Sequence, residues 1–264
     1  MKILYVGDIM GDMGIRVVEQ VLPKLRRDTH ATLVIAQGEN VSDGRGILPD
    51  DYQRLKNAGI DFFTGGNWSL HHKQIYGAMN DLNQPVIRPA NYPEGTPGLG
   101  WKYAKSVGGD VLVISLLGHI VGRDADKPTD NPLVVVDRIL EMEADHEKSA
   151  IIVDFHGDYS SEKVIIGHYL DGRVSAVIGD HWHVPTADAR ILPNGTAHIT
   201  DVGMCGALDA SLGITLESVI PRWRDGVQNR NVLAKSGATQ FNAVLIAIEG
   251  STRSTSIEQL QLVS

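Results

Sequence analysis

The sequence predicts an α/β protein in which a mixed system of β-sheets is flanked by helices. Short apolar runs alternate with amphipathic stretches through the first half of the chain. The runs end in glycine, aspartate or asparagine, as buried strands commonly do. Between them, apolar residues recur at the spacing of a helix face. Strands alternating with helices indicate βαβ units and parallel pairing, and we expect a single domain over residues 1–264.

The elements of the first half follow from this alternation. Four apolar runs predict strands, at residues 2–7, 32–38, 61–66 and 85–91. The stretches between them predict helices, at residues 14–28, 49–58 and 71–82. In the first helix one face is apolar and is formed by Ile15, Val18, Val21, Leu22 and Leu25.

The second half begins with a change of character. Residues 100–118 predict two strands joined by a Gly-Gly-Asp turn, which is an antiparallel hairpin. The next elements are expected in the order helix, strand, helix and strand, at residues 131–147, 150–157, 160–170 and 174–181. The "SSEK" stretch offers a cap for the helix at 160–170. The tail from residue 189 indicates β-structure, with turns at Asn194-Gly195 and Gly250-Ser251.

Composition excludes several classes of protein. The net charge of −8, with an isoelectric point near 5.6, disfavours a broad binding surface for nucleic acid. Cys205 is the only cysteine, so we expect a reducing compartment and a small buried residue rather than a nucleophile. The N-terminal apolar run is too short for a signal peptide, and no run approaches about 18 apolar residues. We therefore expect a cytoplasmic protein without a membrane span.

Polar side chains able to bind metal ions gather where the expected strands end. Two carboxylates, two amides and three imidazoles occupy these positions, namely Asp8, Glu39, Asn40, Asn67, His156, His181 and His183. Ligands in α/β proteins bind at the carboxyl ends of strands, so we expect these side chains to converge. His181 and His183 stand two apart in a segment expected to be extended, which would point both at one site.

These ligand types indicate a catalytic metal site. The set is too rich in oxygen for a structural zinc site, and it suits a pair of manganese, iron or zinc ions bridged by a carboxylate. Two such ions, about 3.5–4 Å apart, stabilise the attacking and leaving oxygens in phosphoester hydrolysis. They also lower the pKa of a bridging water.

Each of these residues also has a simpler explanation. Asp8 could cap a helix, and Glu39 and Asn40 could be turn residues. His156 could be a hydrogen-bonded core histidine. The "GDIMGDMG" stretch at residues 7–14 could be a phosphate-binding loop, although it fits neither the GxGxxG nor the P-loop pattern. The recurrence of such residues at five successive strand ends argues against coincidence.

The ordered motifs of the chain resemble those of the calcineurin-like metallophosphoesterases. These motifs are "GDIMG", "GEN", "GNW", "DFHGDYSSEK", "GDHWHVPTAD" and "TDVGMCG". The closer match is the bacterial YmdB branch, which "RPANYPEGTPG" and "FNAVLIAIE" also fit, so the resemblance covers nearly the whole chain. It implies an αββα sandwich, a binuclear metal centre, 2′,3′-cyclic nucleotide phosphodiesterase activity and homo-oligomers.

The resemblance also assigns two sets of metal ligands by motif. One ion would be held by Asp8, Glu39, Asn40 and His183. The other would be held by Glu39, Asn67, His156 and His181, with Glu39 bridging the two. The cofactors implied are two divalent or mixed-valence metal ions, iron or manganese first and zinc as an alternative.

The chain departs from the family at Trp68. In the family the residue after Asn67 is a histidine, the proposed proton donor, and an indole does not titrate near neutral pH. Three explanations stay open. His71 or His72 replaces the missing acid; the indole stacks against a base or an aromatic leaving group, with its N–H on a phosphate oxygen; or the protein has lost turnover and survives as a binder. Simple packing of Trp68 is compatible with all three.

The expected function is a metal-dependent phosphodiesterase acting on a small phosphodiester or cyclic nucleotide. General acid catalysis contributes about 10²–10⁴-fold, so the change at Trp68 is expected to reduce or alter the activity. The alternative is a catalytically impaired metal-binding protein that regulates a partner or binds a nucleotide. A third possibility is a nucleotide-binding domain built on residues 7–14 without metal.

Overall fold

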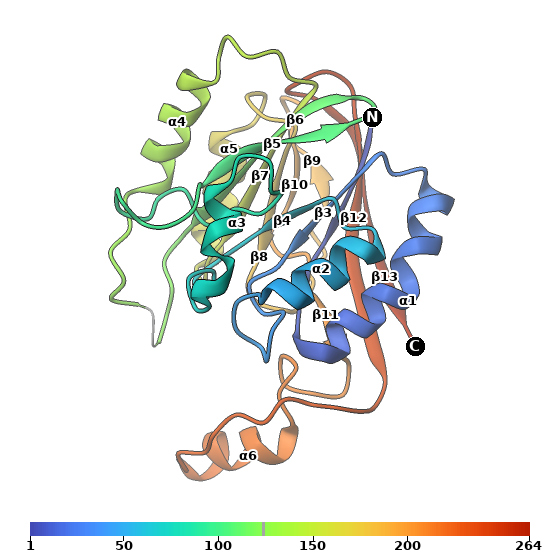
Figure 1. Cartoon of the computed structure of the whole chain (residues 1–264), viewed down its shortest axis with the longest axis vertical. Helices are drawn as coiled ribbons and strands as arrows, with labels where there is room; N and C mark the ends of the chain where they lie inside the picture. The colour runs from blue at the N-terminus through green and yellow to red at the C-terminus, as the bar shows by residue number, and fades with distance from the viewer. Residues whose placement is uncertain (123–124) are drawn as a thin grey trace.

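The computed structural model describes residues 1–122 and 125–264. Within these ranges two β-sheets lie face to face, and helices cover their outer faces (Figure 1). This is the αββα sandwich that the family resemblance implied, and it confirms the α/β class expected from the alternation of strands and helices.

The first sheet contains parallel and antiparallel strands. Its order is β2, β11, β12, β1, β3 and β4, with β13 also paired to β12. The strands are β1 (Lys2–Val6), β2 (Asp8–Ile9), β3 (Leu33–Gln37), β4 (Phe62–Thr64), β11 (Met204–Ala207), β12 (Thr239–Ile248) and β13 (Ser254–Val263). β1, β3 and β4 run parallel, so their carboxyl ends lie at the same edge.

The second sheet has the order β5, β6, β7, β8, β10 and β9. Its strands are β5 (Trp101–Ser106), β6 (Gly109–Leu117), β7 (Ala150–His156), β8 (Ala176–Asp180), β9 (Arg190–Ile191) and β10 (Ala197–Ile199). The expected hairpin is confirmed, because β5 and β6 pair antiparallel. β6, β7, β8 and β10 run parallel, which again brings carboxyl ends to one edge.

Alternation along the strands builds the core between and outside the sheets. On β1, Ile3 and Tyr5 pack between the sheets, whereas Leu4 and Val6 face the helices of the first sheet. Both faces of the strand therefore bury apolar surface, and each Å² of buried apolar surface stabilises the fold by about 25 cal/mol. Burial on both faces explains why the strands appear in the sequence as continuous apolar runs.

Two pairs of helices cover the sandwich. α1 (Gly11–Thr29) and α2 (Pro49–Ala58) pack on the first sheet, and α4 (Pro132–Met142) and α5 (Ser160–Tyr169) pack on the second. A short α3 (Tyr76–Asn80) follows a 3₁₀ turn at Lys73–Ile75. Figure 1 shows α6 (Leu216–Asp225) projecting from the body at the bottom of the view.

The structure corrects two predictions in the region of residues 71–91. The expected helix at 71–82 is reduced to the 3₁₀ turn and α3, so His71 and His72 lie outside any helix. The expected strand at 85–91 is a single bridge, between Val86 and Phe63. Pro85 and Pro89 have no N–H to donate, which prevents a continuous ladder there.

Three further predictions are corrected in the second half. The helix expected over 131–147 ends at Met142. The "SSEK" cap is absent, because α5 begins after Tyr159 without a side-chain hydrogen bond at its N-cap. The tail contains α6 in addition to strands, and Pro221 lies inside this helix. The turns at Asn194-Gly195 and Gly250-Ser251 are confirmed, with positive φ at both glycines.

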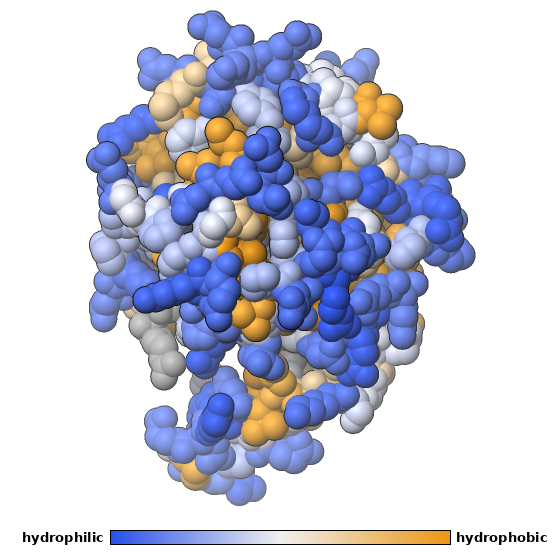
Figure 2. Space-filling model, viewed as in Figure 1, coloured by the Kyte–Doolittle hydropathy of each residue, from blue (hydrophilic) through white to orange (hydrophobic). Residues whose placement is uncertain are grey.

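The surface is largely hydrophilic in the view of Figure 2, with an apolar patch low in the picture where the α6 segment joins the body. In the described part of the chain, no helix combines the length and the apolar character needed to cross a membrane.

Candidate metal centre

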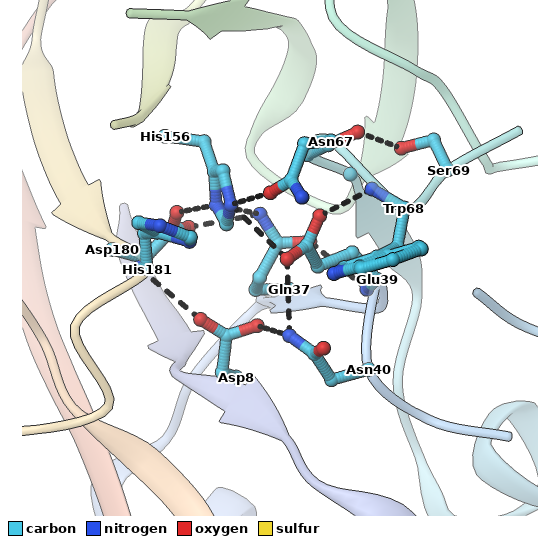
Figure 3. Close-up of polar contacts among 12 residues, drawn as sticks. Asp8, Gln37, Glu39, Asn40, Asn67, Trp68, Ser69, His156, Asp180 and His181 are labelled. Carbon is cyan, nitrogen blue, oxygen red and sulfur yellow. Dashed lines mark hydrogen bonds and ion pairs between the residues drawn. The ribbon is translucent and has the colours of Figure 1, made fainter. Parts of the chain in front are cut away.

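Seven polar side chains from both sheets meet at one edge of the sandwich, and Figure 3 labels all of them except His183. Asp8 begins β2, Asn67 lies in the turn after β4, and His156 ends β7. The others lie within three residues of the ends of β3 and β8 and are Glu39, Asn40, His181 and His183. We call these seven residues the polar cluster. They are the residues that the sequence predicted to converge; their binding of metal stays a prediction.

His156 lies at the centre of the polar cluster. Its Nε2 atom is 3.1 Å from Glu39 Oε1 and 3.0 Å from Asn67 Oδ1. Its Nδ1 atom is 2.5 Å from Asp180 Oδ1. A neutral imidazole that donates from Nδ1 to a carboxylate keeps a lone pair on Nε2. In this neutral form, which a bound metal ion would favour, the Nε2 lone pair faces the Glu39 and Asn67 oxygens.

Asp8 and Asn40 form the other half of the polar cluster. Asn40 Nδ2 donates to Asp8 Oδ1 at 3.0 Å and to Glu39 Oε1 at 3.1 Å. The main-chain N–H of His181 donates to Asp8 Oδ2 at 3.2 Å. His183 Nε2 is 3.7 Å from the same oxygen. The Asp8 carboxylate thus ties the β2 strand to both histidines that follow β8.

His181 and His183 reach Asp8 through a bent loop. Their φ values are 102° and 63°, in the region that non-glycine residues seldom adopt. The expectation that an extended segment aims them at one site is therefore wrong about the backbone, although both residues approach Asp8. His181 Nε2 is 3.3 Å from Asp158 Oδ2, and its Nδ1 is buried without a hydrogen-bond partner among the described residues.

The missing side chain of Gly66 allows the Glu39 carboxylate and the His156 ring to approach the backbone. A Cβ atom at this position would lie 2.3 Å from Glu39 Oε2 and 2.5 Å from His156 Nε2. The main-chain N–H of Trp68 donates to Glu39 Oε2 at 2.9 Å. The segment that carries Asn67 therefore also fixes the position of Glu39.

Burial and mutual charge shift the pKa values of the polar cluster. Burial, followed by the charge of Asp180, raises the pKa of Asp8 well above its usual range. Burial acts against both charged forms in the Glu39–His156 pair, but their attraction lowers the pKa of Glu39 and helps to raise that of His156. Burial and the nearby His181 lower the pKa of His183 to about 4. His183 is therefore neutral at pH 7, which is the form that binds metals.

A buried polar network behind the polar cluster was not predicted from the sequence. Tyr5 Oη lies 2.9 Å from Asp154 Oδ1 and 3.0 Å from Asp180 Oδ2. Gln37 Nε2 donates to Asp180 Oδ2 at 3.0 Å, and Gln37 Oε1 accepts from the main-chain N–H of Glu39 at 3.1 Å. The available signal was position, because Gln37, Asp154 and Asp180 stand one or two residues before members of the polar cluster.

The donor set of the polar cluster fits divalent metal ions. Ligand atoms of Glu39, His156 and His181 all lie within 4.8 Å of one another. Carboxylate, amide and imidazole donors are those that manganese, iron and zinc accept. Asp8 and Glu39 are only 0% and 1% exposed, and a bound cation would stabilise the charged forms of these buried carboxylates. Nδ1 of His181, which is buried and has no hydrogen-bond partner among the described residues, is a further electron-pair donor available to a metal ion.

Trp68 lies beside Glu39, with its half-buried indole next to the polar cluster (Figure 3). The guanidinium of Arg45 lies over the ring, 4.6 Å from the ring centroid. The ammonium of Lys127 is 5.7 Å from the same centroid. The His71 ring meets the indole edge-on at 5.6 Å, and the His72 ring is 4.7 Å from that of His71. The described ring contacts of the two histidines are thus with Trp68 and with each other.

Most of the simpler explanations are excluded by hydrogen bonds. Met10 is the N-cap residue of α1 and no side chain caps this helix, so Asp8 is not a cap. The main-chain N–H groups of Asp8, Met10 and Gly11 donate to carbonyls elsewhere in the chain, so the 7–14 stretch does not present them to a phosphate. Glu39 and Asn40 do lie in a turn, and their side chains join the polar cluster as well.

Cys205 is a packing residue, as expected. It is fully buried, its Sγ lies 3.6 Å from the Asn242 carbonyl oxygen, and burial raises its pKa to about 12. A thiol with so high a pKa supplies no thiolate nucleophile near neutral pH.

Comparison with known proteins gives a consistent family match. The family model described as "YmdB-like protein" matches residues 4–260. The 2′,3′-cyclic-nucleotide 2′-phosphodiesterase of Bacillus subtilis (strain 168) is 40% identical over 253 residues, which cover 96% of this chain and 93% of that protein.

Solved structures show the same fold. The crystal structure of a phosphatase from Mycoplasma pneumoniae superposes with a TM-score of 0.91 at 29% identity, covering 100% of this chain and 93% of that one. A 5′-nucleotidase precursor from Thermus thermophilus has a TM-score of 0.59 at 10% identity, covering 100% of this chain and 54% of that one. At that identity the second likeness concerns the fold alone.

Proposed function

Because this chain belongs to the YmdB-like family, we propose that it hydrolyses 2′,3′-cyclic nucleotides with two divalent metal ions bound at the polar cluster. The chain is a hydrolase of phosphate esters with a metallophosphoesterase fold, and this fold implies divalent metal ions. The observation that carries the proposal is the convergence of oxygens from Glu39 and Asn67 on Nε2 of His156.

The proposed ligands form two sets that share Glu39. One ion would be held by Asp8, Glu39, Asn40 and His183, and the other by Glu39, Asn67, His156 and His181. Manganese or iron suits this mixture of oxygen and nitrogen donors best, with zinc as an alternative. When bound, two such ions polarise the phosphoryl group and lower the pKa of a water molecule.

The residues around the ligands orient them for this task. Asp180 accepts from His156 Nδ1, which fixes the tautomer and directs Nε2 to the site. Asn40 Nδ2 donates to the Asp8 and Glu39 carboxylates, and the main-chain N–H of Trp68 donates to the second oxygen of Glu39. This preorganisation lowers the reorganisation needed when substrate binds.

The proton for the leaving ribose oxygen must come from a group other than the Trp68 indole. We place this proton on water or on a histidine, and His71 is the ring next to Trp68. The Arg45 guanidinium covers part of the indole, which disfavours its use as an open stacking surface for a base. We therefore expect proton transfer to the leaving oxygen to limit the rate of hydrolysis.

The test is hydrolysis of 2′,3′-cyclic AMP by Mn²⁺-loaded protein, beside the variant Trp68→His. If proton donation limits the natural protein, the variant is expected to gain about 10²-fold in kcat. A natural protein that is already fast, with no gain in the variant, would show that another group donates the proton. His71→Ala and His72→Ala then identify which histidine does so.

An aryl phosphodiester separates the enzyme from the alternative of a regulatory or nucleotide-binding protein. Its leaving group needs no proton, so bis(p-nitrophenyl) phosphate reports on the metal site alone. Cleavage of this ester without cleavage of 2′,3′-cyclic AMP means that only the acid is missing. If neither is cleaved by protein with metal bound, the chain is a binder.

We also infer self-association through the exposed apolar side of α6. Leu216, Ile220 and Trp223 stand four and three residues apart, so they share one face of the helix. Their exposed fractions are 43%, 51% and 83%. A projecting apolar face of this kind is typical of interaction sites, and a second copy of the chain is the partner proposed here.

A further inference from the structure

We propose that Arg45 and Lys127, held beside Trp68, bind the 5′-phosphate of a nucleotide whose cyclic phosphate lies at the polar cluster. The inference rests on the proposed function and names a second anionic group that the substrate carries. We call Trp68, Arg45 and Lys127 the cation subsite.

The cation subsite adjoins the polar cluster through Trp68. The main-chain N–H of Trp68 donates to Glu39 Oε2 at 2.9 Å, so the residue is connected directly to the proposed bridging carboxylate. Its indole contacts both cations, at 4.6 Å for Arg45 and 5.7 Å for Lys127. An anion held by these cations would therefore lie next to the metal ligands. One small substrate could then place one phosphate at the polar cluster and another at the cation subsite.

Arg45 is positioned by a tight loop that starts at the polar cluster. The N–H of Gly46 donates to the carbonyl of Glu39, and the N–H of Arg45 donates to the carbonyl of Ser42 at 3.0 Å. The half-buried Arg45 side chain forms no ion pair with a carboxylate within residues 1–122 and 125–264. Stacking on an indole orients a guanidinium without neutralising it, so the charge remains available to an anion.

Lys127 brings a second cation to the same place from a different part of the chain. Its Nζ donates to the main-chain carbonyl of Asn67 at 3.0 Å, which fixes the ammonium beside the turn that carries Trp68. The side chain is exposed at the rim. A rim position suits a part of the substrate that stays near solvent, such as the 5′ end, while the cyclic phosphate is buried among the metal ligands.

A phosphomonoester is the anion that these groups fit best. It carries about −1.5 to −2 charges at pH 7 and three acceptor oxygens, which match a guanidinium fork and an ammonium. The net charge of −8 disfavours a long polyanion, so the ligand is of mononucleotide size. We therefore take a mononucleotide phosphate as the anion for Arg45 and Lys127, which both lie over the Trp68 indole.

The kinetic test compares 2′,3′-cyclic AMP with the same compound carrying a 5′-phosphate, using Mn²⁺-loaded protein. We expect kcat/KM to be at least about tenfold higher for the 5′-phosphorylated compound, since charge-assisted contacts have this size. Arg45→Gln and Lys127→Gln are expected to abolish most of this preference, and Trp68→Leu to lower it. Arg27→Gln and Lys105→Gln remove exposed cations elsewhere and should keep it.

Three results would overturn the cation subsite. The first is a natural protein that does not prefer the 5′-phosphate, and the second is a preference that survives Arg45→Gln and Lys127→Gln. The third is an equal loss of activity on both substrates in these variants, which would place the cations on the cyclic phosphate itself. Thermal unfolding of each variant confirms that a loss is not a failure to fold.

Calorimetry supplies a readout that does not depend on turnover. Adenosine 5′-monophosphate is titrated into metal-loaded protein and into protein stripped with a chelator. Binding to both forms, weakened about tenfold by Arg45→Gln, supports the cation subsite; binding only to the loaded form means that the phosphate sits on the metals and contradicts it. Failure of the proposed function is seen separately, as loss of aryl phosphodiester cleavage, and leaves this titration unaffected.

Discussion

At the scale of single residues, the space left by Gly66 is as important as the ligands that surround it. The Glu39 and His156 side chains occupy the volume that a Cβ atom would fill. The φ of Gly66 is not in the left-handed region, so the requirement for glycine is one of space rather than backbone conformation. The polar cluster thus depends on a residue that offers no donor atom.

Gly66→Ala is therefore expected to disrupt the metal site with little effect on the fold. The added methyl group displaces Glu39 or His156, and we expect metal-dependent hydrolysis to fall by about 10²-fold, as for misplacement by about 1 Å. Gly77→Ala is the matched control, because nothing lies within 4 Å of a Cβ there and the residue is in α3. Full activity of the Gly66→Ala variant would show that the carboxylate and imidazole are not the ligands.

Some residues at the site were predictable from the sequence and others were not. The members of the polar cluster were predictable because they are reactive types at strand ends. Asp180 was not, since an aspartate beside a histidine gives no sign that it will face a different histidine, His156, from a neighbouring strand. Arg45 and Lys127 meet on one indole through loops whose paths no periodicity records.

At the scale of elements, β5 is tied to the irregular segment after α3 by one buried lysine. Lys102 Nζ donates to the main-chain carbonyls of Ala78, Asp81 and Gln84, at 3.2, 2.6 and 2.9 Å. The lysine is 3% exposed. It adds a charged donor to these carbonyls, of which those of Asp81 and Gln84 also accept from the main-chain N–H groups of Gln84 and Val86.

Lys102→Met keeps most of the side-chain volume and removes these three hydrogen bonds. We expect it to lower the free energy of unfolding by about 3 kcal/mol, because buried carbonyls lose their charged donor. Lys105→Met on the same strand removes an exposed ion pair with Asp110 and should change stability by less than about 1 kcal/mol. Urea unfolding of both variants is the measurement, and equal effects would contradict this account.

Long, regular elements were predictable, and short or interrupted ones were not. The α1 and α2 helices and the strands β1, β3, β7 and β8 lie close to the predicted positions, because burial on both faces or on one stripe leaves a clear pattern. The α6 helix was missed; Pro221 is usually a helix breaker but lies inside it. The helix expected to reach Glu147 stops at Met142, where the Glu143 side chain instead accepts hydrogen bonds from Trp101 and Tyr103.

At the scale of the whole molecule, the sandwich brings together carboxyl ends from both sheets and leaves α6 outside. The residues of the polar cluster lie at or after strands β2, β3 and β4 of the first sheet and β7 and β8 of the second. The cluster therefore forms only when both sheets are assembled. The α6 segment contributes none of its residues to the polar cluster, and its apolar side chains Leu216, Ile220 and Trp223 are exposed. We propose that α6 serves self-association rather than the polar cluster.

Trp223→Glu is expected to shift the protein from an oligomer to a monomer. A buried tryptophan is a common energetic centre of an interface, and a charge there is costly to desolvate. Val107→Glu is the control, since Val107 is an exposed apolar residue at the distant β5–β6 turn. Sedimentation velocity decides the matter, and a natural protein that is monomeric at micromolar concentration would refute the proposed association.

The most direct test of the central claim is to count the metal ions bound per chain in the natural protein and in His156→Ala. The account predicts about two ions per chain in the natural protein, with cleavage of bis(p-nitrophenyl) phosphate that is lost on chelation and restored by Mn²⁺. It predicts that His156→Ala retains at most about one ion and no measurable cleavage. A natural protein without metal after incubation with Mn²⁺, Fe²⁺ or Zn²⁺, or an unchanged metal content in His156→Ala, would contradict it.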